Sequence, residues 1–142
     1  MALATLALSA QKGPDFSGVW VAVSPARFAG QQVTILHDEM SLTVLQGAEP
    51  GQEHGNIYQL DGTPERDVEN ANGVETVTIT TAAWVRDRVV VTRALTTSRG
   101  RKIDSTLTFS LNRRGELLQE LIEVVNGETQ PAVTLLSKKK GS

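Results

Sequence analysis

The sequence predicts an all-β fold, a single antiparallel up-and-down β-barrel of about eight to nine strands. Short stretches rich in Val, Ile, Leu and Thr recur between Phe16 and Lys138, and Gly, Asn and Asp turn residues separate them. After Phe16, only the short segment 26–30 has a helical pattern. Because an open sheet leaves two unpaired edges, we expect this many consecutive hairpins to close into a barrel.

The bulk composition indicates one domain, since a chain of 142 residues buries about two thirds of the surface that it exposes when unfolded. The formal net charge of -2 comes from scattered acids and bases, so we expect no nucleic-acid partner. Cysteine is absent, which rules out disulfides, thiolate nucleophiles and Cys-ligated zinc. Two histidines are too few for a three-histidine zinc site, and we expect neither a metal nor a cofactor.

We divide the chain into an apolar segment 1–14, a barrel 15–138 and a tail 139–142. The first ten residues are small and apolar, and they precede a plausible cleavage site, but they lack the basic region of a secretion signal. We favour a truncated signal over a short N-terminal helix, and we therefore expect an extracytoplasmic protein, periplasmic or secreted, while a cytoplasmic one stays open. The segment is too short to span a bilayer, and we expect no membrane span.

The first half of the barrel is predicted to hold a strand that ends at Ser24, before Pro25, and further strands over residues 32–38, 41–45 and 57–60. Trp20 and Ala22 alternate with valines in the first strand. In the second, His37 continues the apolar row of Val33 and Ile35. Residues 62–73 are polar and lack a period, so we interpret them as a long surface connection beside a binding mouth.

The second half is predicted to hold denser strands, over residues 74–85, 89–97, 103–111 and 131–137. Asn126-Gly127 is the strongest two-residue hairpin signal in the chain. Thr76, Thr78 and Thr80 share one face of their strand, where they would either line a wet lumen or face solvent. We favour solvent.

The segment Phe16-Ser17-Gly18-Val19-Trp20 resembles the G-x-W opening of lipocalins and related calycin barrels. Residues 35–42, 58–62, 83–91 and 109–117 are similar, in order and spacing, to blocks of small secreted bacterial lipocalin-like proteins of unknown function. The resemblance covers about residues 15–138. It implies a barrel, export and an apolar ligand, with Trp20 closing one end of the barrel against a basic side chain from a late strand, for which Arg93 is the candidate.

Polar residues that interrupt apolar rows are the candidate site residues, because a buried polar group usually has a hydrogen-bond partner or a function. His37 comes first, since an imidazole can act as a base near neutral pH. Glu39 would share its face about 7 Å along the strand. We expect these two residues to be catalytic only if the protein is an enzyme; otherwise His37 lies at the barrel rim, hydrogen-bonded or wet. The predicted ligand-binding residues are His37, Tyr58, Trp84, Arg93, Gln119 and Glu120.

The function that we favour is a binding protein that holds one apolar or amphipathic small molecule in the barrel lumen. The alternative is a small barrel enzyme, a hydrolase, isomerase or cyclase, that uses His37 with nearby carboxylates as acid and base. A filled barrel with a purely structural role is a third, weaker reading. The expected partner is thus a small-molecule ligand or substrate, and assembly into a homo-oligomer stays open.

Overall fold

The computed structural model describes residues 13–46 and 54–141. They form an antiparallel sheet of 11 strands and one 3-10 turn, η1 (Ala26–Phe28). The strands are β1 (Gly18–Ser24), β2 (Gln32–His37), β3 (Ser41–Gln46), β4 (His54–Gln59), β5 (Glu65–Ala71), β6 (Val74–Val85), β7 (Arg88–Thr97), β8 (Lys102–Leu111), β9 (Leu117–Val125), β10 (Glu128–Thr129) and β11 (Val133–Lys139). The all-β prediction is confirmed. The truncated signal or short helix expected before residue 11 lies outside the described residues.

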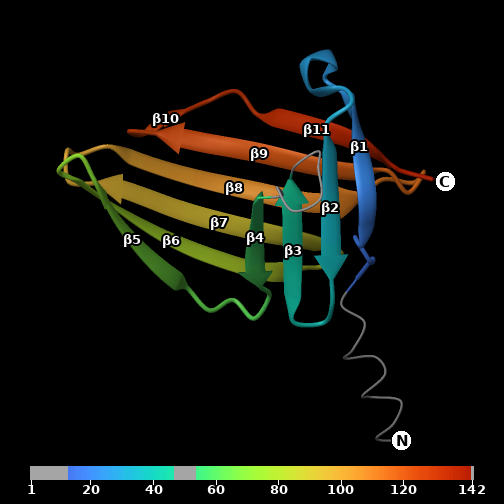
Figure 1. Cartoon of the computed structure of the whole chain (residues 1–142), viewed down its shortest axis with the longest axis horizontal. Coiled ribbons are helices and arrows are strands. Elements are labelled where there is room, and N and C mark those ends of the chain that lie inside the picture. The colour runs from blue at the N-terminus through green and yellow to red at the C-terminus, as the bar shows by residue number, and fades with distance from the viewer. Residues whose placement is uncertain (1–12, 47–53, 142) are drawn as a thin grey trace, which may run out of the picture.

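The sheet is a bent meander whose two ends are β4 and β5. The strand order is β4-β3-β2-β1-β11-β9-β8-β7-β6-β5, and β10 pairs with β9. Figure 1 shows β1 to β4 crossing in front of the long strands β6 to β9 at a steep angle, so that the sheet folds over on itself. In the described part of the chain, no helix is long and apolar enough to cross a membrane.

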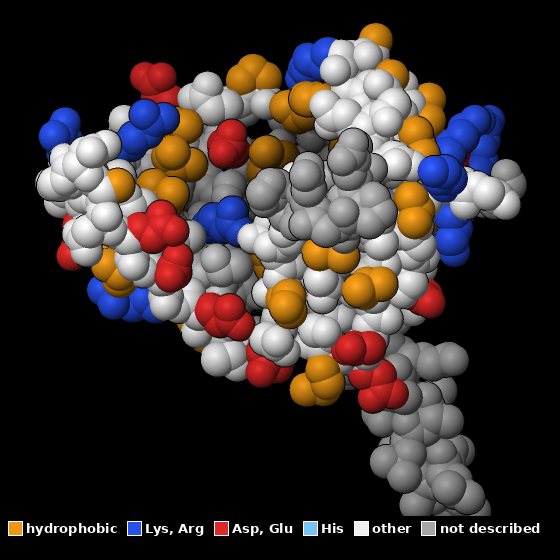
Figure 2. Space-filling view, in the orientation of Figure 1, with side chains coloured by type: hydrophobic (Ala, Val, Ile, Leu, Met, Phe, Trp, Pro, Cys, Tyr) orange, Lys and Arg blue, Asp and Glu red, His pale blue; other side chains and the backbone are white. Residues whose placement is uncertain are grey.

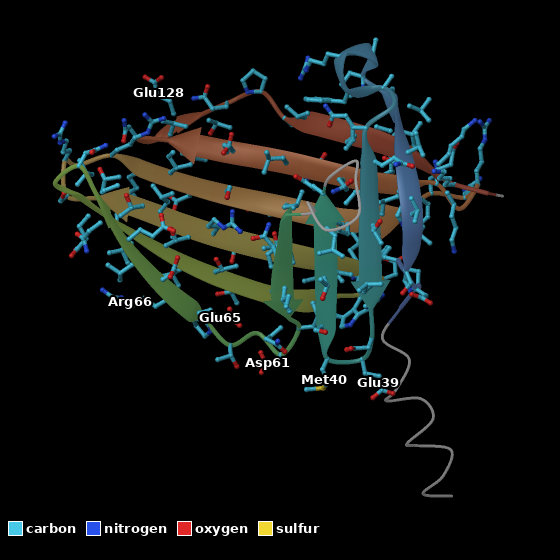
Figure 3. The ribbon with its side chains drawn as sticks, viewed as in Figure 1. Glu39, Met40, Asp61, Glu65, Arg66 and Glu128 are labelled. Carbon is cyan, nitrogen blue, oxygen red and sulfur yellow. The ribbon has the colours of Figure 1, made fainter. Side chains whose placement is uncertain are left out.

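The expectation of a closed ring is not met, because no ladder in the described part of the chain joins β4 to β5. A single bridge between Asp61 and Ala83 ties the end of β4 to β6. Next to it, the backbone N–H of Gly62 donates to the carbonyl oxygen of Ala82 at 3.0 Å. Asp61 and Glu65 lie at the edge where the two ends of the sheet approach each other (Figure 3).

The prediction of a long surface connection over 62–73 is wrong, since β5 occupies most of it. Asn72 and Gly73 have φ angles of 53° and 76°, the left-handed values that a two-residue hairpin requires, and this turn pairs β5 with β6. Every residue of β5 is exposed. Its charged side chains are typical of an edge strand that avoids pairing with other chains. Because both faces of β5 are exposed, its sequence has no hydrophobic period.

The turn between β2 and β3 sets where β2 ends. Oδ1 of Asp38 accepts hydrogen bonds from the backbone N–H groups of Met40 and Ser41, both at 2.8 Å. This carboxylate turn ends β2 at His37. Glu39 therefore belongs to the turn and is not on the strand beside His37, as Figure 3 shows with Met40 next to it.

The hydrophobic core lies where the front strands cross the long ones. Its most buried large side chains are Phe16, Trp20, Ile35, Leu42, Phe109 and Leu117. The Nε1–H of Trp20 donates to the carbonyl oxygen of Phe16 at 2.9 Å. The basic partner of Trp20 comes from a late strand as expected, but it is Lys139, with Nζ 5.9 Å from the ring centroid, and not Arg93.

The threonine row of β6 faces inward. Thr76, Thr78 and Thr80 are half-buried and share the face of Ala82, which is only 3% exposed, whereas Ile79 on the opposite face is 40% exposed. The prediction that this row faces solvent is therefore wrong. The inner surface of the sheet is apolar where the strands cross and polar along the first half of β6, where Thr76, Thr78 and Thr80 lie.

Candidate functional site

A cavity of 310 Å³ lies between the front strands and the pair β9 and β11. Figure 2 shows the molecule hollowed between these layers. The residues that line the cavity are Gly30, Gln31, Gln32, Val33, Gln46, Gln119, Leu135 and Ser137. They come from strands far apart in the sequence, so the cavity exists only once the sheet has folded over.

The strand registers aim these side chains at one another. Gln119 of β9 pairs directly with Leu135 of β11, and directly paired residues project from the same face of a sheet. Ser137 follows two positions after Leu135 and therefore shares that face. Across the cavity, Val33 of β2 pairs with Gln46 of β3.

The cavity has a buried floor and an exposed mouth. Ser137 and Val33 are 1% and 8% exposed, and they form the floor. Gln31 and Gln46 are exposed and lie at the mouth. Gly30 has a φ of +91°, a value that side chains other than glycine rarely adopt, and its N–H donates to the carbonyl oxygen of Ala22 at 2.9 Å. The chain therefore turns back tightly after η1, and the start of β2 lies over the cavity.

Two polar atoms in the cavity wall lack partners. The Oε1 atom of Gln119 and the Oγ atom of Ser137 are buried and make no hydrogen bond within the described part of the chain. Leaving a buried polar atom without a partner costs about 1–3 kcal/mol, so such atoms are uncommon in folded proteins. Here they provide an acceptor and a hydroxyl, which is both donor and acceptor, for whatever enters the cavity.

A second, smaller cavity of 150 Å³ lies beside His37, on the side of the N-terminal segment. Its lining residues are Gly13, Pro14, Asp15, His37, Asp38, Glu39 and Trp84. The imidazole stacks on Phe16 with ring centroids 5.5 Å apart, and it contacts Trp84 at 5.3 Å. Its side chain is 7% exposed. The expected rim position therefore holds only in part, since two aromatic rings cover the histidine.

The hydrogen bonds of His37 are structural. Its Nδ1 accepts from the backbone N–H of Phe16 at 3.1 Å. Its own backbone N–H donates to Oγ of Ser17 at 3.1 Å, and that hydroxyl donates to the His37 carbonyl oxygen at 3.3 Å. The nearest carboxylate is Asp15, with Oδ1 3.6 Å from Nδ1. His37 thus fastens the segment before β1 to the end of β2.

Burial keeps the imidazole neutral. Desolvation lowers the pKa of His37, and the carboxylates of Asp15 and Asp38 oppose this shift with smaller effects. Hydrogen bonds from Ser17 lower the pKa of Asp15, and those from the backbone of Met40 and Ser41 lower the pKa of Asp38. At neutral pH the smaller cavity therefore holds a neutral imidazole beside ionised carboxylates. Within the described ranges no group of three or more His, Cys, Asp or Glu is placed to hold a metal ion.

The predicted site residues separate into different places. Gln119 lines the larger cavity, whereas His37, Glu39 and Trp84 line the smaller one. Tyr58 is 7% exposed and belongs to the core. Glu120, next to Gln119 on β9, is exposed and projects from the opposite face.

Arg93 lies on the inner face of β7, between its paired neighbours Thr80 and Ser105. Its Nε is buried and has no hydrogen-bond partner among the described residues. It lines neither of the cavities described above. Of the predicted ligand-binding residues, Gln119 alone is among the described residues that line the larger cavity.

The sequence-based search missed Ser137. The residue interrupts the apolar row of Val133 and Leu135 on β11, which is the same signal that singled out His37 and Gln119. The glutamines at the mouth, Gln31 and Gln46, gave no such signal because they lie at strand ends, where polar residues are ordinary.

Comparison of the chain with protein-family models gives no match, and comparison with curated proteins gives none either. The likeness to lipocalin-like proteins therefore stays a prediction.

Proposed function

We propose that this protein binds a small amphipathic molecule in the 310 Å³ cavity, with the folded-over sheet acting as a lipocalin-like cup. The observation that carries the proposal is the unpartnered polar pair, Gln119 Oε1 and Ser137 Oγ, in the wall of a cavity that also has apolar sides. Ligand sites commonly combine an apolar surface with a few converging polar groups. The volume is at the small end of the usual range, which favours a small ligand.

The placement of the cavity supports binding over a purely structural role. The large aromatic and aliphatic side chains fill the crossing of the strands, and the cavity lies beside that core, with Val33 belonging to both. A wall selected for stability alone would place apolar side chains at positions 119 and 137, since unpaired polar atoms there weaken the fold. A ligand that supplies the missing hydrogen bonds explains their presence.

The alternative, an enzyme built on His37 and Glu39, has less support. Nδ1 of His37 already accepts the N–H of Phe16, and the rings of Phe16 and Trp84 both pack against the imidazole. Glu39 is in a turn, and its side chain is exposed. A general base needs a free nitrogen within reach of a substrate proton, and the described residues that line the larger cavity include no titratable side chain.

The experiment that tests binding compares two leucine-to-tryptophan variants. Leu135→Trp fills the cavity, whereas Leu36→Trp adds the same bulk on the outer face, where Leu36 is 56% exposed. Ligands are found by titrating the wild type with a panel of small amphipathic molecules and following backbone chemical shifts. We expect shifts to cluster around Gln119 and Ser137, to disappear in Leu135→Trp and to persist in Leu36→Trp. Shifts that survive in Leu135→Trp, or that cluster elsewhere, would contradict the proposal.

A further inference from the structure

The described polar residues that line the larger cavity are all neutral. Four of the lining residues are glutamines, Gln31, Gln32, Gln46 and Gln119, and a serine completes the polar set. The described lining residues include no Asp, Glu, Lys, Arg or His. This contrasts with the smaller cavity, where Asp15, His37, Asp38 and Glu39 gather.

A neutral lining selects against ionised ligands. An ionised group that leaves water needs a counter-charge or several strong hydrogen bonds, and otherwise its burial is unfavourable. The floor, with Ser137 at 1% and Val33 at 8% exposure, provides no counter-charge. A carboxylate or ammonium group would therefore stay at the mouth or outside.

The orientation of the unpartnered atoms adds a second requirement. Oε1 of Gln119 is a carbonyl oxygen, so only a hydrogen-bond donor satisfies it. Oγ of Ser137 has both a donor and acceptor sites, so it can pair with either kind of group. With the Gln119 amide oriented as in the structure, a ligand that carries only acceptors would satisfy the serine and would leave Oε1 buried and unpaired.

We infer that the ligand is an uncharged molecule with an N–H or O–H donor, held by Gln119 and Ser137, and with a short apolar part against Val33 and Leu135. This inference rests on the proposed function and adds the chemical class of the ligand. An amide, an alcohol or a ring with an N–H group fits the description, whereas a fatty acid anion or an amine does not.

The test uses probes that share one short chain and differ only in their head group. Hexanamide is neutral and carries a donor, methyl hexanoate is neutral and carries acceptors alone, and hexanoate and hexylammonium are charged. Each is titrated into the full chain at pH 7.5, and binding is followed through the chemical shifts of the Leu135 methyl groups. We expect hexanamide to bind about tenfold tighter than methyl hexanoate, the ratio that one hydrogen bond gives. The charged probes should bind at least about tenfold more weakly than hexanamide.

The variant Gln119→Leu tests whether Gln119 causes the preference for hexanamide over methyl hexanoate. Gln119→Leu keeps the approximate volume and removes the acceptor, so it should bring hexanamide and methyl hexanoate within about twofold of each other. Gln130→Leu is the matched control, because Gln130 is exposed and lies outside the cavity. Charged probes that bind as well as hexanamide would overturn the inference and leave the proposed function intact. Failure of every probe to perturb the cavity at millimolar concentration would overturn both.

Discussion

Nδ1 of His37 accepts a hydrogen bond from the backbone N–H of Phe16 at 3.1 Å, and the ring of Phe16 stacks on the same imidazole. The bond needs a lone pair on Nδ1, so it exists only while that nitrogen is unprotonated. Together with the two hydrogen bonds between Ser17 Oγ and the His37 backbone, this contact joins the segment 13–17 to β2, and the rings of Phe16 and His37 both pack against Trp84. The protonation state of a single side chain therefore affects how this end of the sheet is held together.

The first prediction is that the protein loses stability as the pH falls from about 7.5 to 5.5. Burial lowers the pKa of His37, so the folded state binds fewer protons than the unfolded state, whose histidine titrates near 6.5. The contribution of His37 to stability is complete above the pKa of the unfolded histidine, and it is lost as the pH falls below that value. Urea denaturation at a series of pH values measures the change.

His37→Gln should flatten this pH dependence, since it removes the titrating group and keeps a hydrogen-bonding side chain. The aspartates with lowered pKa values, Asp15, Asp38 and Asp61, act in a separate range, because their contribution is lost only below about pH 4. A free energy of unfolding that stays constant or rises between pH 7.5 and 5.5 would show that His37 is not the desolvated group described here.

The second prediction separates the two tryptophans. Trp20→Phe removes the N–H that pairs with the Phe16 carbonyl oxygen and leaves that oxygen buried, so we expect a loss of about 1–3 kcal/mol beyond the loss of volume. Trp84→Phe removes a similar volume, but Nε1 of Trp84 has no partner in the described part of the chain. This variant should therefore lose stability only through the lost volume. Thermal or urea unfolding of both variants measures the difference. Equal losses would contradict the assigned hydrogen bond.

The fold could be predicted from the sequence where hydrophobic period and turn chemistry agree. Residues 74–85 were predicted at their observed bounds, and Asn126-Gly127 adopts the positive φ angles expected of its hairpin. β5 was missed because an exposed edge strand has no buried face, so nothing imposes a period of two on its side chains. The prediction of a closed barrel fails for a different reason, since pairing between the distant edges β4 and β5 depends on tertiary packing that no local pattern encodes.

The candidate site was harder to predict than the fold. Gln119 and His37 were both found as polar interruptions of apolar rows, but the sequence could not tell that they lie in different cavities. That separation depends on strand registers and on the angle at which the sheet folds over. Ser137 shows the limit of the method, because a small hydroxyl in a strand near the end of the chain is equally common on an exposed surface.

The third prediction compares two serines with opposite surroundings. Ser17→Ala removes a hydroxyl that bonds the backbone of His37 twice, and we expect a loss of about 1 kcal/mol. Ser137→Ala removes a buried hydroxyl without a partner among the described residues, so stability should stay within about 0.5 kcal/mol of the wild type or rise. The same variant should bind the cavity ligand more weakly. Denaturation and titration of both variants measure this, and a large loss of stability in Ser137→Ala would show that its hydroxyl is already paired.

The fourth prediction concerns the open edge. β7 is paired with β6 on one side and β8 on the other, whereas β5 is paired, among the described strands, with β6 alone. In an antiparallel edge strand about half of the backbone N–H groups point away from the partner, and on β5 every residue is exposed. Amide hydrogen exchange in peptides from residues 65–71 should therefore be faster than in peptides from 89–97 by at least an order of magnitude. Equal protection of the two strands would mean that the edges of β4 and β5 join in solution and that the sheet closes into the barrel expected from the sequence.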